Sequence, residues 1–224
     1  MNKYELHSHT AECDRVARLG GKELVRLYRE AGYSGIVITD HYFSLFYDWF
    51  GEELPDREHK CIIDRYLRGY YAAREEGERC GFTVLCGAEV RFDSTINDYL
   101  VYGLEESDFY NMPLLNRLKG VEELKAALPE QALIVQAHPF RDNMTVCNPE
   151  NLFGIEVHNG GTEPFRNQMA RIYAEHYGKA MTSGSDIHGI GALAKGGICT
   201  EHNIQTAEDL VKVLRGGEYS LICN

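Results

Sequence analysis

The stretch Gly35-Ile36-Val37-Ile38-Thr39-Asp40-His41 sets a pattern that recurs along the chain. Its apolar, β-branched residues are typical of a strand that is buried on both faces in a parallel sheet. An acid and a histidine follow where the apolar run stops. Similar runs recur between segments with helical periodicity, and several of them also end on histidine or a carboxylate.

The alternation of the two kinds of segment predicts an α/β fold. We expect strands over residues 4–7, 35–39, 82–86, 99–102, 133–137, 154–158 and 180–183. We expect helices over residues 22–31, 62–79, 121–128, 163–177 and 206–215, the last beginning with a capping box at Thr206 to Asp209. Strand–helix alternation is typical of a parallel sheet, open or closed into a barrel. No linker-like segment interrupts residues 1–224, which we expect to form one domain.

The composition argues against several classes of protein. The formal net charge of −11 disfavours non-specific nucleic-acid binding, because an acidic surface repels phosphate backbones. We expect a cytoplasmic protein without a membrane partner, since no apolar run reaches about 18 residues and no signal region begins the chain. The seven cysteines are irregularly spaced without a C-x-x-C pair, which argues against a disulfide framework or zinc knuckle. The oligomeric state stays open.

Histidines gather where the predicted strands end. In His7-Ser8-His9 both imidazoles point to the same side, because side chains alternate along a strand, so they can bind one metal ion. Taken alone, this pair is better explained by chance or a polar surface. Further motifs occupy corresponding places: Asp40-His41, Glu89, His138, and Asp186 with His188. Because the carboxyl ends of barrel strands share one face, the motifs together predict a metal site there.

In order and spacing, these motifs resemble the PHP family, named for its polymerase and histidinol phosphatase members. The resemblance extends over nearly the whole chain. It is carried by His7-Ser8-His9, Asp14, Thr39-Asp40-His41, Glu89, Ala137-His138-Pro139 and Asp186-Ile187-His188. It implies an α/β fold of the PHP type, a distorted (β/α)7 barrel similar to the TIM barrel, with two or three divalent ions.

The resemblance also implies a ligand set. The ligands of a first ion correspond to His7, His9, Glu89 and Asp186. Glu89 is shared with a second ion, which His138 also binds. The ligands of a third ion correspond to Asp14, His41 and His188. The family often adds a histidine to the second ion from the strand after the glutamate; no histidine stands there in this chain, and Asp98 is the nearest substitute.

Such a site predicts hydrolysis of a small phosphorylated substrate, either a phosphomonoester or a nucleotide-type ester. Mixed histidine and carboxylate ligands suit zinc, manganese or iron, and neighbouring ions can share a hydroxide that attacks phosphorus. The residues expected to serve catalysis are Glu89, Asp186, His188 and Arg141. Arg141 would also bind the phosphate, because a guanidinium fits phosphate oxygens in a bidentate manner. Lys195 and His158 are further substrate-binding candidates, although a solvated lysine and a structural histidine explain them equally well.

Two other functions stay open: an amidohydrolase-like enzyme that cleaves C–N bonds, and a metal-binding PHP module without turnover. The first is weakened because no lysine at a predicted strand end could bridge ions after carboxylation. The second is weakened by the nearly complete ligand set. The stretch from Tyr42 to Phe50 holds six aromatic residues directly after a metal motif. It could form a lid over the substrate, a dimer contact or a small local core.

Overall fold

The computed structural model describes residues 1–54 and 58–224. The strands are β1 (Asn2–Glu5), β2 (Gly35–Ile38), β3 (His41–Tyr42), β4 (Thr83–Arg91), β5 (Asp98–Leu104), β6 (Leu133–Gln136), β7 (Gly154–Asn159), β8 (Ala180–Gly184), β9 (Gly196–Thr200) and β10 (Ser220–Cys223). The α-helices are α1 (Gly21–Glu30), α2 (Leu45–Phe50), α3 (His59–Tyr66), α4 (Arg68–Cys80), α5 (Glu106–Asn111), α6 (Val121–Ala127), α7 (Pro164–His176) and α8 (Ala207–Gly216). Short 3-10 turns lie at Gly51–Glu53, Leu115–Arg117, Pro149–Asn151 and Ile190–Ala192.

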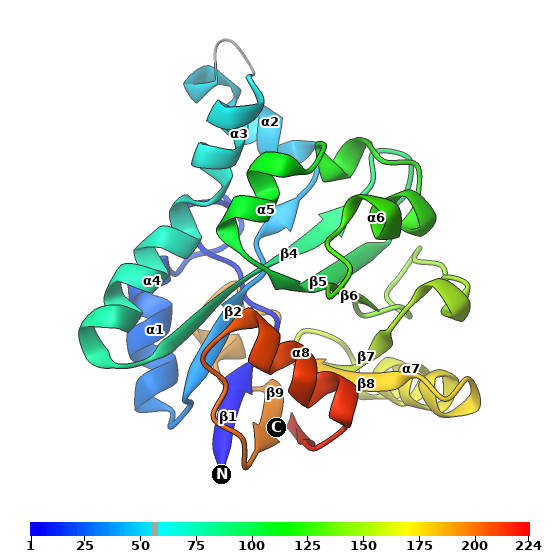
Figure 1. Cartoon of the computed structure of the whole chain (residues 1–224). Helices are drawn as coiled ribbons and strands as arrows, with labels where there is room; N and C mark the ends of the chain where they lie inside the picture. Colours follow the sequence, from blue (N-terminus) through cyan, green and yellow to red (C-terminus); the bar gives the residue numbers. More distant parts are fainter. Residues whose placement is uncertain (55–57) are drawn as a thin grey trace.

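The ten strands form one sheet, with helices packed around it (Figure 1). The hydrogen-bonded order is β10-β9-β1-β2-β4-β5-β6-β7-β8, and β3 pairs with β4. The edge strand β8 meets β9 and β10 through side chains. The Ser183 hydroxyl donates to the Ile222 carbonyl at 2.5 Å and accepts from the Gly197 N–H at 3.2 Å. The sheet is therefore almost closed, as the predicted distorted barrel requires.

Strand β5 departs from the parallel sheet that we predicted. It runs antiparallel to both β4 and β6, whereas the pairs β1–β2, β2–β4, β6–β7 and β7–β8 are parallel. The reason is the short link 92–97, because a parallel crossover needs a connection of about a dozen residues or more. The reversal brings Asp98, the first residue of β5, to the edge where β4 and β6 end.

Two further sequence predictions were wrong in detail. The long helix over 62–79 is divided into α3 and α4 at Leu67, whose ψ of 1° leaves the helical region. Just after the break, α4 passes very close to the loop after β1, since a Cβ on Gly69 would lie 1.8 Å from Thr10 Oγ1.

Strands β9 and β10, both antiparallel, were not predicted. The capping box at Thr206 is confirmed, with its hydroxyl accepting from the Asp209 N–H at 3.1 Å.

Two clusters of buried side chains hold the sheet and its helices together. The larger one joins the sheet to α1, α3, α4 and α7. The second packs α8, through Leu210 and Leu214, against the strand residues Tyr4, Leu100 and Tyr102. Within the described residues, no helix has the length and apolar character needed to cross a bilayer.

Candidate metal centre

The structure brings the predicted strand-end residues together at one edge of the sheet. His7 and His9 follow β1, Glu89 lies near the end of β4, and His138 follows β6. Asp186 and His188 follow β8. Backbone contacts tie the first pair to the last, since Ser8 and Ile187 form a parallel bridge and the His9 N–H donates to the Ile187 carbonyl at 3.3 Å. Residues from opposite ends of the sequence therefore share one site.

Four buried side chains, His7, His9, Glu89 and Asp186, surround a common point that we call the inner position. His7 Nε2 lies 3.3 Å from Glu89 Oε1 and 3.5 Å from Asp186 Oδ1. His9 Nε2 lies 3.4 Å from Glu89 Oε2 and 3.2 Å from Asp186 Oδ1. None of the four side chains is more than 3% exposed. His7, His9 and Glu89 are close enough to one another to be ligands of a single ion, and Asp186 Oδ1 lies within 3.5 Å of both histidines.

The inner position is also where polar atoms lack partners. Within the described residues, His7 Nε2, His9 Nδ1 and Nε2, Glu89 Oε2 and Asp186 Oδ1 are buried without a hydrogen bond, although Glu89 Oε2 forms an ion pair with His41 Nε2 at 2.9 Å. Buried polar atoms without partners are rare, because each loses its interaction with water and gains nothing in return. A divalent cation at the common point would satisfy nitrogen lone pairs and carboxylate oxygens together, so the residues present fit a metal ion.

Protonation at the inner position suits cation binding at Glu89 and His9 but not at His7. Burial lowers the pKa of His7, but the charges of Glu156, Glu89 and Asp186 outweigh it and raise this pKa, so His7 would have to release a proton on binding a metal. Burial raises the pKa of Glu89, but the charges of His7 and His41 outweigh it and hold this pKa well below its usual range. Burial lowers the pKa of His9 to about 3, and the neighbouring His41 and His188 act in the same direction. Glu89 is therefore ionised and His9 neutral near pH 7, which are the forms that bind a metal.

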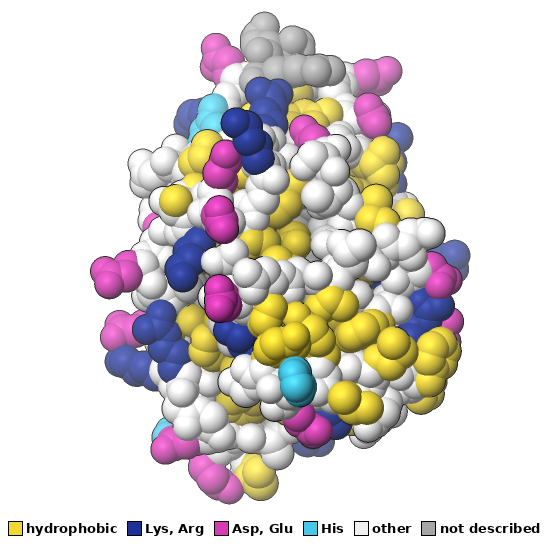
Figure 2. Space-filling model, turned by 90° about the vertical axis from the view of Figure 1, so that its right-hand side faces the viewer, with side chains coloured by type: hydrophobic (Ala, Val, Ile, Leu, Met, Phe, Trp, Pro, Cys, Tyr) yellow, Lys and Arg dark blue, Asp and Glu magenta, His cyan; other side chains and the backbone are white. Residues whose placement is uncertain are grey.

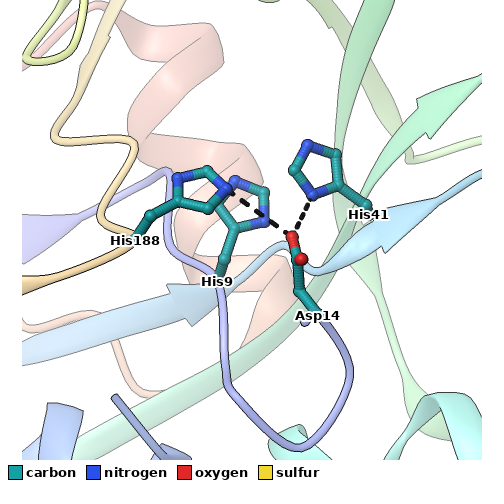
Figure 3. Close-up of side chains that lie close together, drawn as sticks. All are labelled: His9, Asp14, His41 and His188. Carbon is teal, nitrogen blue, oxygen red and sulfur yellow. Dashed lines mark hydrogen bonds and ion pairs between the residues drawn. The ribbon is translucent and has the colours of Figure 1, made fainter. Parts of the chain in front are cut away.

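Next to it, His9, Asp14, His41 and His188 form an outer position (Figure 3). Asp14 Oδ2 lies 2.5 Å from His41 Nδ1 and 3.6 Å from His188 Nε2. The His9 ring stacks between the other two imidazoles, with centroid distances of 4.2 and 4.3 Å. The side chain of His188 is 31% exposed, so the outer position is open to solvent.

A third group, Glu89, Asp98 and His138, will be called the Asp98 position. His138 Nε2 lies 3.0 Å from Glu89 Oε1 and 3.8 Å from Asp98 Oδ2. Both oxygens of Asp98 accept hydrogen bonds from Arg91, at 2.6 Å each. Sequence reasoning missed Arg91, because only the antiparallel pairing of β4 and β5 places it opposite Asp98.

Two of the predicted ligands have unusual backbone conformations. His138 has φ of 27° and Asp186 has φ of 51°, both outside the usual range for residues with a Cβ. Such conformations persist when the surrounding structure holds them in place. The His138 N–H donates to Glu156 Oε2 at 3.0 Å, which is one such restraint.

Three buried polar residues that were not predicted support the site. Glu156 on β7 accepts from His7 Nδ1 at 2.8 Å and from the Asn159 amide at 2.9 Å, so it orients the His7 ring. Asn159 also donates to Asp186 Oδ2 at 3.2 Å. Glu5 on β1 accepts from the backbone N–H groups of His7 and Ser185 and from Tyr28. A carboxylate within an otherwise apolar strand, as at Glu156, was the signal that could have revealed this layer.

The structure brings Arg141 to the cluster. Its Nη2 donates to Asp186 Oδ2 and, at 2.9 Å, to Asn159 Oδ1, and its Nε donates to Thr162 at 3.1 Å. Lys195 and His158 lie elsewhere, in a separate cavity of about 420 Å³ beside the start of α7. There the His158 ring nitrogen Nε2 lies 3.0 Å from the Lys195 carbonyl. Among the described residues, neither forms a hydrogen bond or ion pair with a predicted metal ligand.

The aromatic stretch covers the end of β3, the turn that follows this strand, and α2. Tyr42, Phe43, Phe46 and Phe50 are buried, and Tyr47 and Trp49 are half-buried against the same core. Phe43 stacks on the His41 ring at a centroid distance of 4.8 Å, and Trp49 meets Phe43 edge-on at 5.3 Å. Most of the stretch is thus a local core that supports a candidate ligand.

Comparisons with known proteins agree with this architecture. A family model described as PHP-associated matches residues 164–219. All of this chain aligns with a two-domain protein from Bacteroides vulgatus, described as containing a predicted PHP-like metal-dependent phosphoesterase, at a TM-score of 0.70 and 18% identity. The chain spans only 65% of that protein. No curated protein sequence gives a significant match.

Two further structures resemble the chain. A candidate metal-dependent phosphoesterase from Bifidobacterium adolescentis aligns over 95% of each chain, at a TM-score of 0.53 and 18% identity. An amidohydrolase from Chromobacterium violaceum, with bound sulfate and no metal, aligns over 85% of this chain and 89% of its own, at a TM-score of 0.57 and 14% identity. The predicted resemblance is confirmed for the fold: the chain has the PHP-like barrel and, at residues 164–219, a PHP-associated segment.

Proposed function

We propose that the protein is a metal-dependent phosphoesterase acting on a small phosphate ester, a phosphomonoester or a nucleotide-type compound. The observation that carries the proposal is the convergence of buried, unpartnered donor atoms at the inner position. The similarity to structures described as metal-dependent phosphoesterases supports the type of reaction. We further propose a cytoplasmic protein whose residues 1–224 form one domain; the free cysteines of the described chain support the location.

We assign the metal ligands by position. The inner position would be held by His7, His9, Glu89 and Asp186. The outer position would be held by Asp14, His41 and His188 beside His9. Mixed nitrogen and oxygen donors suit zinc, manganese or iron. Such ions activate water at neutral pH and stabilise negative charge on phosphoryl oxygens.

The chain's own residues would bind and orient the substrate. A cavity of about 490 Å³, lined by Asp186, His188 and Arg18, opens beside the outer position and has the size of a small-molecule site. Arg141 Nε and Nη2 are engaged with protein acceptors, whereas Nη1 makes no hydrogen bond within the described residues. Arg141 is therefore fixed in place with a donor remaining for a phosphate oxygen.

A second candidate is hydrolysis of a C–N bond, favoured by the similarity to the Chromobacterium violaceum amidohydrolase. Within the described residues, no lysine side chain is buried as the side chains of the inner position are. A carboxylated lysine bridging two buried ions therefore has no candidate among them. This favours the phosphoesterase, and the structure of that amidohydrolase holds sulfate, an anion shaped like phosphate.

Metal analysis combined with a substrate screen tests the proposal. Purified protein, stripped and then loaded with zinc, manganese or iron, is assayed on phosphomonoesters, nucleotides, cyclic phosphates and a panel of amides. We expect bound metal and turnover of a phosphate ester that a chelator abolishes. Turnover of amides alone would favour the second candidate. Bound metal without any turnover would favour a non-catalytic module.

A further inference from the structure

Arg91 and Asp98 form a bidentate ion pair at the edge of the metal centre. They lie directly opposite each other in the antiparallel pair β4–β5. Arg91 Nε donates to Asp98 Oδ1 and Arg91 Nη2 donates to Asp98 Oδ2, both at 2.6 Å. Asp98 is 1% exposed and Arg91 is 32% exposed. This is the bidentate geometry in which a guanidinium binds a carboxylate most strongly.

The pairing leaves Asp98 without a free oxygen. At the inner position Arg141 also contacts a carboxylate, but it engages Asp186 Oδ2 and leaves Oδ1 buried and unpartnered. Within the described residues, Asp98 has no buried polar atom without a hydrogen bond, and Glu89 Oε1 accepts from His138 at 3.0 Å. At the Asp98 position, the carboxylate oxygens therefore already accept hydrogen bonds, and both Asp98 oxygens accept them from a cation.

The aromatic stretch from Tyr42 to Phe50 holds Arg91 in this arrangement through Phe43. The Arg91 guanidinium lies 5.6 Å from the centre of the Phe43 ring, within the range of a cation–π contact. Phe43 is itself buried between the His41 ring and Trp49. An arginine in a protein keeps its charge at every accessible pH, so the Asp98 position contains a permanent positive charge.

Resting on the proposed function, we propose that Arg91 takes the place of a metal ion at the Asp98 position. The chain then binds two ions, at the inner and outer positions, and Asp98 is the partner of Arg91 instead of a metal ligand. A divalent ion at this position would have to separate a bidentate ion pair and sit a few ångströms from a fixed cation. Removing the arginine charge should open the position to a third ion.

Counting bound ions tests the inference directly. Wild type, Arg91→Met, Asp98→Asn and the double variant are stripped, equilibrated with excess manganese, separated from free metal and analysed for ions per chain by elemental analysis. Calorimetric titration with manganese gives a second count. Arg74→Met is the matched control, because Arg74 also pairs with a carboxylate, that of Glu106, but lies away from the site. Circular dichroism checks that each variant is folded.

We expect two ions in the wild type, Asp98→Asn, Arg74→Met and the double variant, and three in Arg91→Met. Asp98→Asn keeps the test decisive even if Arg91→Met does not fold, because it asks only whether Asp98 is a ligand. A third ion in the wild type, or an ion lost from Asp98→Asn, would overturn the inference while leaving the phosphoesterase intact. A folded Arg91→Met with two ions would overturn it as well. A wild type that binds no ion would instead reject the proposed function on which the inference rests.

Discussion

The inner position and the Asp98 position share Glu89, yet they differ in what their donor atoms already do. At the inner position, nitrogen and oxygen atoms point to one place and lack partners within the described residues. At the Asp98 position, oxygens of Asp98 and Glu89 already accept hydrogen bonds from Arg91 and His138. Both would be identified as metal sites from residue types and spacing alone. On the proposal above, unpartnered ligand atoms, as well as ligand identity, distinguish a site that binds an ion from one that does not.

The largest effect should come from removing a ligand of the inner position. Asp186→Asn replaces the carboxylate whose Oδ1 faces His7 and His9. We expect the loss of one bound ion and a fall in kcat of about 100-fold or more, the scale of removing a positioned electrostatic group. Elemental analysis and steady-state kinetics measure the two effects. Unchanged ion content would contradict the assignment of the inner position.

A smaller effect should follow when the residue that orients a candidate ligand is changed. Glu156→Gln keeps the shape of the side chain but replaces the charged acceptor of His7 Nδ1. Residues that orient a ligating histidine typically contribute about 10- to 100-fold to metal affinity. We therefore expect a weakening of that size at the inner position, measured by competition with a chelating dye. Asp142→Asn, at an exposed carboxylate that pairs with Arg166, should leave the affinity unchanged.

Arg141 and Arg91 offer a comparison of two arginines at one site. Arg141→Met should raise KM for a phosphate ester about 10-fold, because a hydrogen bond to a charged group contributes about 1.5 kcal/mol or more. It should not add an ion, since Asp186 Oδ1 already faces the inner position. Arg141→Lys should recover part of the loss. An unchanged KM in Arg141→Met would argue against a role in binding phosphate.

The smallest effect is expected in the aromatic stretch from Tyr42 to Phe50. Trp49→Ala removes the edge contact to Phe43, which packs on both His41 and Arg91. We expect KM or metal affinity to change by about 3-fold or less and the melting temperature to fall, because a half-buried contact is lost. Analytical ultracentrifugation decides the alternative: a change of oligomeric state would support a dimer contact.

A separate surface lies away from all three positions. Helix α7 and the residue after it expose Phe165, Met169, Ile172 and Tyr177. Figure 2, which faces that side of the molecule, shows hydrophobic side chains gathered in its lower half. None of these residues belongs to the metal groups of the described chain. Substitutions here are therefore suitable controls for the predictions above.

Much of the candidate centre could be predicted from sequence, because most candidate ligands follow a short apolar run and the ends of such runs share an edge. The sequence did not predict contacts between side chains that only the fold brings together. Asp98 was recognised as a substitute for a histidine, but its contact with Arg91 depends on an antiparallel strand that alternation rules do not anticipate. Glu156 was passed over within a strand, since its partner His7 lies 149 positions away.

The bridge between Ser8 and Ile187 has a consequence for synthesis and folding. Glu5 and Ser185, 180 positions apart, are joined in the same region. His7 and His9 are synthesised before Asp186 and His188. The candidate ligand set is therefore complete only after the later residues have been made. Closing so long a loop is entropically costly and favours late formation of the β1 contacts. An ion that binds only the finished barrel would then stabilise it by mass action, so metal capture would mark the completion of folding.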